Sequence, residues 1–176
     1  MKHTTTRSIA SILCLLLLAP VVATAGSVPL CALIKPEEVA AMAPFKIPLV
    51  RSEGWPLSSS TSGCRYVFES ADGERAGVAI GVTDMGTKTN VLAHFTNTAS
   101  DFKNVWSVEP QMLPDLGDKA WFGGMDETGL KIIRSTLVAD INMRGMSPEV
   151  TAEMKRQSSI SLAGLLLKRL DQLKLK

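Results

Sequence analysis

The chain has 176 residues, of which 45% are hydrophobic and 20% are charged, and its 19 Lys and Arg residues nearly balance its 17 Asp and Glu residues. This composition is typical of one globular domain that is large enough to bury its own core. The balanced charge, without a cluster of Lys and Arg between aromatic residues, argues against nucleic-acid binding.

Residues 1–25 predict a secretory signal peptide. Lys2 and Arg7 give a positive start, an apolar run follows, and residues 23–25 form a small-x-small cleavage site. The apolar run is too short to predict a membrane-spanning helix. We therefore expect a periplasmic or secreted protein whose mature part, residues 26–176, is a single domain with equal numbers of basic and acidic residues.

Two cysteines follow the leader, Cys31 and Cys64. In an oxidising compartment they predict one structural disulfide, and their spacing is not the Cys-x-x-Cys of a redox motif. Neither Cys14, inside the apolar run, nor Cys31 follows the Leu-small-small triplet that lipidation needs. The mature protein is therefore expected to be soluble and without a lipid anchor.

The first half of the mature chain predicts a helix and then a hairpin. Pro36, followed by two glutamates, begins the helix, which ends before Pro44. Prolines and a serine run over residues 45–63 predict a long surface loop. Alternating residues over 65–69, a turn, and a second strand over 77–83 predict a β-hairpin.

The second half begins with another helix. The segment Thr87-Lys88-Thr89 is predicted to cap a helix over 90–102, whose apolar residues recur on one face. A short strand is predicted over 105–108, before a proline-rich bend over 110–114. Another strand begins at Lys119.

Residues 130–143 favour β structure but are too long for one strand, so we expect a break near Arg134. Ser147, Pro148 and Glu149 together predict the start of a last helix that runs toward Leu173. Its wide apolar stripe predicts packing against the sheet. The alternative is that its basic flank lies on anionic lipid.

Together these elements predict an α+β fold, with helices packed on an antiparallel sheet and a long C-terminal helix. The order of helix, hairpin, helix and hairpin suggests a weak duplication.

The sequence offers little chemistry for catalysis. His94 is the one histidine after the leader, which argues against multi-histidine zinc sites and most nucleophilic hydrolases. No Gly-x-Ser-x-Gly elbow or phosphate-binding loop is present. The acidic residues weighed as Ca²⁺ ligands match no loop motif and are Asp115, Asp118, Asp126 and Glu127. The methionines weighed as Cu(I) ligands are Met85, Met112, Met125, Met143 and Met146. We expect no cofactor and no metal ion.

The predicted loop over 45–63 holds the candidate binding residues, Trp55 and Leu57. Trp55 lies between glycine and proline, and an aromatic side chain in such a loop is a plausible interface anchor. The alternative is a lid that folds back onto the core.

Three short motifs carry a family resemblance. They are Cys31-Ala32-Leu33-Ile34-Lys35-Pro36-Glu37-Glu38, Gly63-Cys64-Arg65-Tyr66-Val67-Phe68 and Leu116-Gly117-Asp118-Lys119-Ala120-Trp121-Phe122. With them the chain resembles the small secreted or lipid-anchored envelope proteins of unknown function best known from actinobacteria. The resemblance implies an α+β fold with a single disulfide and no catalytic residue. The chain departs from that family in lacking the lipidation cysteine.

We therefore expect an exported, non-enzymatic binding module that recognises another envelope protein or a small ligand, as an inhibitor, an immunity-type antagonist, a sensor or an accessory protein. The alternative function is a hydrolase acting on envelope material, with Asp115 and Asp118 as acid and base.

Overall fold

The computed structural model describes residues 29–56, 58–123, 128–145 and 149–174, and for residues 55, 56 and 174 it describes the backbone alone. The predicted signal peptide lies outside the described residues.

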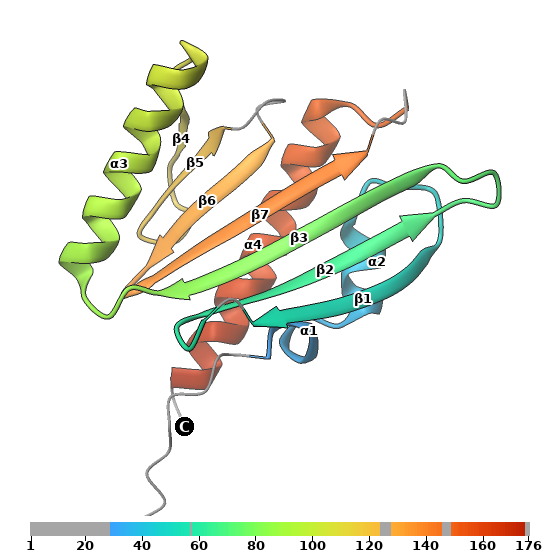
Figure 1. Cartoon of the computed structure of the whole chain (residues 1–176), viewed down its shortest axis with the longest axis horizontal. Helices are drawn as coiled ribbons and strands as arrows, with labels where there is room; N and C mark the ends of the chain where they lie inside the picture. The colour runs from blue at the N-terminus through green and yellow to red at the C-terminus, as the bar shows by residue number, and fades with distance from the viewer. Residues whose placement is uncertain (1–28, 57, 124–127, 146–148, 175–176) are drawn as a thin grey trace, which may run out of the picture.

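The elements within these ranges are α1 (Leu30–Leu33), α2 (Pro36–Met42), β1 (Leu49–Pro56), β2 (Thr61–Glu69), β3 (Arg75–Asp84), α3 (Lys88–Trp106), β4 (Gln111–Leu113), β5 (Lys119–Gly123), β6 (Gly129–Arg134), β7 (Leu137–Gly145) and α4 (Ala152–Lys174). The strands form one antiparallel sheet in the order β1-β2-β3-β7-β6-β5-β4 (Figure 1). This confirms the predicted α+β class and the long C-terminal helix.

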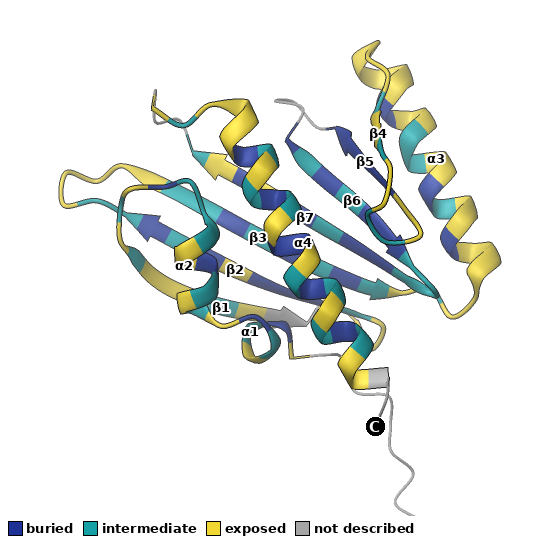
Figure 2. Cartoon of the chain, turned by 180° about the vertical axis from the view of Figure 1, so that it is seen from behind, coloured by how far each residue is buried: buried dark blue, intermediate teal, exposed yellow. Residues whose placement is uncertain are grey.

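The helices lie on both faces of the sheet. Figure 2, seen from behind, shows α1, α2 and α4 in front of the strands, and α3 lies against the other face near β4 and β5 (Figure 1). Because side chains alternate along a strand, each face has its own core cluster. The larger cluster, under α1, α2 and α4, includes Tyr66, Phe68, Ile80, Leu130, Ile132, Ile141, Leu162 and Leu166. The smaller one, under α3, includes Val91, Phe95, Phe102, Trp121, Ile133 and Val138.

A disulfide holds the N-terminal segment to the sheet. Cys31 of α1 is bonded to Cys64 of β2 with a Cα–Cα distance of 5.2 Å, which confirms the predicted pairing. Nearby, the Tyr66 hydroxyl donates a hydrogen bond of 2.6 Å to the carbonyl oxygen of Ile34. Burial and the charge of Glu38 raise the pKa of the Tyr66 phenol above its ordinary value. A bonded cysteine pair is typical of a protein in an oxidising compartment.

Several predicted boundaries are confirmed. The Thr87 hydroxyl accepts a hydrogen bond of 3.2 Å from the amide of Asn90 and caps α3, as expected. The predicted hairpin corresponds to β2 and β3. The break in the β-rich segment falls between Arg134 and Leu137, where Ser135 adopts a positive φ of 58°.

Three predictions on irregular segments are wrong. The bend predicted over 110–114 contains β4, which pairs with β5. Residues 45–63 are not a long loop, because β1 and the start of β2 form a hairpin there. The prolines lie at the ends of β1, which is an edge strand and tolerates them. Residues 105–108 are not a strand, because α3 continues to Trp106 and ends at Ser107 in the left-handed conformation.

The last helix begins later than its sequence predicts. Thr151 precedes α4 and accepts a hydrogen bond of 3.2 Å from the amide of Met154, so the cap is Thr151 and not Ser147. Glu149 lies outside the helix, and residues 147 and 148 are outside the described residues. The apolar stripe of α4 is buried against the sheet, with Leu166 fully buried. Among the described residues, no helix is long and apolar enough to cross a membrane.

The suggested helix-hairpin duplication is not seen in the helices, and the strands form two meanders of unequal length. Two antiparallel meanders, β1 to β3 and β4 to β7, meet at the pairing of β3 with β7. The helices that precede them lie on opposite faces, since Val39 of α2 belongs to the larger core cluster and Phe95 of α3 to the smaller one.

Candidate functional site

The sequence-predicted binding residues can be placed only in part. The backbone of Trp55 belongs to β1 and pairs with Gly63 of β2. The side chain of Trp55 and the whole of Leu57 lie outside the described residues.

One half of the sheet carries no helix on its second face. Helix α3 packs on residues of β5, β6 and β7, while the described residues on the same face of β1, β2 and β3 are exposed or half-buried, except for the buried Gly63 (Figures 1 and 2). We call this surface the open face. The side chains and glycines that form it are Arg51, Glu53, Gly63, Arg65, Val67, Glu69, Arg75, Gly77, Ala79, Gly81, Asp140, Asn142 and Arg144.

The floor of the open face is made of small residues. Gly63 and Gly81 are direct cross-strand partners on β2 and β3, and Gly77 and Ala79 follow on β3. A Cβ atom built at Gly81 would meet no atom within 4 Å, so the space above this glycine is open. Glycine inside a strand commonly marks a position where another molecule approaches the backbone closely.

Arginines surround this floor. Arg51 and Arg65 both lie near Glu53, with N–O distances of 3.6 and 3.8 Å, and Arg75 pairs with Glu69 at 3.2 Å. Arg144 is exposed and forms no ion pair with another residue that the structure describes. The open face therefore carries four arginines against three carboxylates, and the carboxylate of Asp140 is also paired with Lys131 of β6.

A hollow of about 350 Å³ lies on the open face beside the edge strand. Its lining residues are Val50, Arg51, Val67, Glu69 and Arg75. Two guanidinium groups beside apolar side chains can bind a carboxylate, because arginine presents paired N–H donors to both oxygens.

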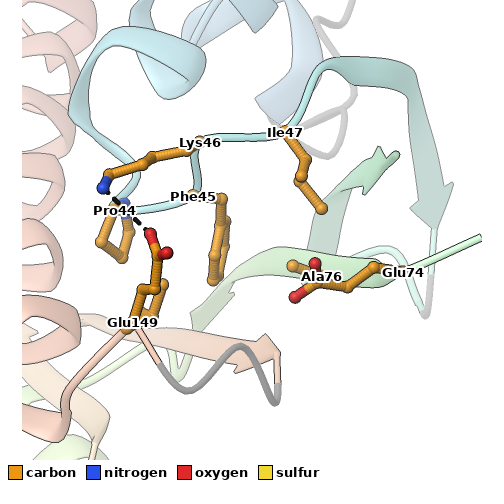
Figure 3. A pocket seen from close by; sticks show the side chains of 8 residues that line it. Pro44, Phe45, Lys46, Ile47, Glu74, Ala76 and Glu149 are labelled. Atoms are coloured by element: carbon orange, nitrogen blue, oxygen red, sulfur yellow. Dashed lines mark hydrogen bonds and ion pairs between the residues drawn. The ribbon is translucent and has the colours of Figure 1, made fainter. Parts of the chain in front are cut away.

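A second hollow, of about 180 Å³, lies at the end of the sheet on the face of the larger core (Figure 3). Phe45 and Ala76 face it, and Lys46 pairs with Glu149 at 3.0 Å across its mouth. Its volume is below the roughly 300 Å³ typical of small-molecule sites. It is a small gap between the segment before β1 and the start of β3.

The carboxylates weighed for catalysis have structural surroundings. Asp118 accepts a hydrogen bond of 2.7 Å from the amide of Ser135 and pairs with Arg134 at 3.4 Å. Asp115 is exposed in a turn with a positive φ of 63°. Neither residue lines the two hollows. Asp126 and Glu127 are outside the described residues.

The other residues weighed for chemistry are dispersed. His94 is half-buried in α3, and no group of three His, Cys, Asp or Glu residues in the described ranges is arranged to hold a metal ion. Among the methionines, Met143 is buried in the larger core and Met112 is exposed on β4. Met125 and Met146 are outside the described residues.

Sequence reasoning missed the open face, although one signal was present. In β3, small residues at 77, 79 and 81 alternate with the buried Val78, Ile80 and Val82. This pattern predicts a strand with large apolar side chains on its core face and only small residues on its other face. Comparison of the chain with protein-family models, with curated proteins and with solved structures found no match.

Proposed function

We propose that the protein is an exported, non-enzymatic binding module whose open face binds an acidic surface of another envelope protein. The observation that carries the proposal is the uncovered half of the sheet, where arginines surround a glycine floor. A sheet face that is covered by a helix has mostly apolar side chains. The residues on the open face are instead mostly polar, small or charged.

The shape of the surface favours a macromolecule over a small ligand. Small molecules are usually bound in enclosed, mostly apolar pockets, whereas the hollow on the open face is open to solvent and three of its five lining residues are charged. Protein interfaces are enriched in arginine, and charge complementarity sets both the partner and the rate of association.

The ion pairs of the free protein support this reading. Glu53 lies between Arg51 and Arg65, and both arginine side chains remain more than half exposed, at 61% and 57%. Exposed pairs of this kind contribute only about 0–1 kcal/mol to stability. They can therefore be exchanged for contacts with a partner at little cost.

The test compares two charge reversals with the same change in net charge. Arg144→Glu lies on the open face and breaks no described ion pair, while Lys168→Glu lies on the exposed side of α4, over the other face. We expect wild-type protein and Lys168→Glu to capture the same partner from a periplasmic fraction. Arg144→Glu should capture less, and the captured complex should dissociate as salt is raised.

Equal capture by the two variants, or binding that does not respond to salt, would contradict the assignment of the open face. Circular dichroism of both variants controls for folding. Competition with an acidic peptide gives an independent measurement, because a carboxylate-rich ligand should occupy the same arginines.

Export belongs to the same proposal. The bonded pair of Cys31 and Cys64 supports an oxidising compartment. N-terminal sequencing of the protein recovered from the periplasm or the medium should begin at or near Gly26. Recovery of a cell-associated protein that still has its leader would contradict export. The capture experiment would still test the proposed binding.

A further inference from the structure

Strand β1 lies at the edge of the sheet, and α1 packs near it on the face of the larger core. The strand pairs with β2 on one side only, and Val50 is 55% exposed, with Arg51, Ser52 and Gly54 also exposed. An edge strand offers unpaired backbone N–H and C=O groups to another strand. The sequence of β1 decides which strand can pair with this edge.

We infer that β1 pairs in antiparallel fashion with β1 of a second copy of this chain, about a two-fold axis at Ser52. This pairing does not depend on the proposed function. It follows from the two charged residues on one face of the strand, Arg51 opposite Val67 and Glu53 opposite Arg65.

A two-fold axis between neighbouring antiparallel strands keeps the faces of both sheets on the same side, so the allowed registers differ by two residues. With the axis at Ser52, Arg51 of each copy lies opposite Glu53 of the other, which gives two attractive pairs. With the axis at Arg51 or at Glu53, like charges lie directly opposite each other. Opposite charges across strands stabilise and like charges destabilise, so the sequence of β1 selects one register.

The surrounding residues extend the same pattern. Within one copy Glu53 already lies opposite Arg65, so the paired register would give an alternating row of Arg65, Glu53 and the second copy's Arg51. Pro56 ends the strand at one side and an irregularity between Leu49 and Arg51 limits it at the other. Charges and proline on an edge usually prevent association; here they exclude the wrong registers and leave one that matches.

Because the pairing is short, we expect a dimer that depends on protein concentration. A stable interface buries about 1,200 Å² or more, and a single pair of short strands buries less. Dimerisation would join the two open faces on one side of a continuous sheet, which is a consequence separate from the binding of any acidic partner.

Analytical ultracentrifugation of the exported, disulfide-bonded protein over a range of concentrations tests this inference. We expect wild-type protein to dimerise. Arg51→Glu replaces both attractive pairs with repulsive ones and should raise the midpoint concentration at least about tenfold. The triple variant R51E/E53R/R65E restores every opposite pair and should dimerise again, as should the control Lys168→Glu. A wild-type protein that stays monomeric at all concentrations, or an Arg51→Glu variant that associates normally, would overturn the inference.

Cysteine cross-linking tests the register itself. Opposed residues in antiparallel strands have Cα atoms about 4.5–5.5 Å apart, which suits a disulfide. Ser52 would lie opposite its own copy, so Ser52→Cys should give a covalent dimer under mild oxidation. The matched control is Val50→Cys on the same strand, which would lie opposite Gly54 and should remain monomeric. Equal cross-linking of both variants would overturn the register, and this result does not depend on whether an acidic partner binds.

Discussion

Replacement of Gly81 by valine separates the stability of the sheet from its use as a binding surface. Gly81 lies in the middle of β3, opposite Gly63, and its backbone has no positive φ that a larger residue would strain. A Cβ atom there would meet nothing within 4 Å. The new side chain should therefore stand above the floor of the open face without moving the strands.

The expected effect on stability follows from these facts. Glycine inside a strand costs about 0.5–1 kcal/mol relative to alanine, and β-branched residues are favoured in strands on a scale of about 1 kcal/mol. With no clash to offset this gain, we expect Gly81→Val to raise the free energy of unfolding by about 0.5–1 kcal/mol. For a domain of this size the melting temperature should rise by about 1–4 °C.

The expected effect on binding has the opposite sign. An isopropyl group on the floor holds a partner away from the backbone of β3, so capture of an acidic partner should fall at least about tenfold, which corresponds to about 1.4 kcal/mol. The control is Gly164→Ala on the exposed side of α4, which also has open space around it. It should raise stability by up to about 1 kcal/mol and leave binding unchanged.

Urea denaturation and partner capture on the same samples give both quantities. A loss of stability above about 1 kcal/mol in Gly81→Val would mean that the space above Gly81 is filled in solution. Unchanged binding in a stabilised Gly81→Val variant would mean that the partner does not use the open face. Either result would contradict the assignment of the glycine floor to partner binding.

Three further changes probe α4 and its surroundings. Leu166→Ala removes a fully buried side chain between α4 and the sheet, so urea denaturation should record a loss of about 2–5 kcal/mol; a loss below about 1 kcal/mol would mean that the stripe is loosely packed. Ser159→Ala removes a buried hydroxyl that has no hydrogen-bond partner in the structure, and it should stabilise the protein by about 1 kcal/mol, whereas a destabilised variant would reveal a hidden partner. The pKa of Glu38 is lowered by a hydrogen bond from the Lys35 amide and by Arg169, so its contribution is present above the ordinary glutamate pKa of about 4.3 and is lost as the pH falls below it. Wild-type protein should therefore be more stable than Glu38→Gln at pH 7, and the difference should shrink as the pH falls below the ordinary glutamate pKa; a constant difference would contradict this account.

The elements that sequence reasoning placed correctly have local signals. Pro36 and the glutamates after it mark the start of α2, and Thr87 supplies the cap of α3 from its own side chain. The pattern of β2 and β3 is a clear alternation because one face of each strand is in the core. Cys31 and Cys64 were the only pair available after the leader.

The elements that sequence reasoning missed are fixed by tertiary contacts. Strand β1 has proline, glycine and charged residues, and it becomes a strand because β2 supplies its hydrogen-bonding partner. The start of α4 depended on which of two hydroxyl residues acts as the cap, and Thr151 rather than Ser147 does so.

Tertiary contacts also determine the candidate site. Arg51, Arg65 and Arg144 are far apart in the chain, and only the register of β1, β2, β3 and β7 brings them onto one face. No spacing rule in the sequence relates them. The glycine floor was visible as a pattern in β3, but its meaning required knowing that α3 covers the other half of the sheet.

The junction between β3 and β7 has a consequence for how the chain folds. Every other pair of neighbouring strands is consecutive in the sequence, whereas this one brings Ile80 together with Ile141 across the whole of α3, β4, β5 and β6. Loop-closure entropy makes such a distant pairing slow compared with local hairpins. The two meanders should therefore form early and join late, and the amides of β3 and β7 should exchange with solvent only when the whole domain opens.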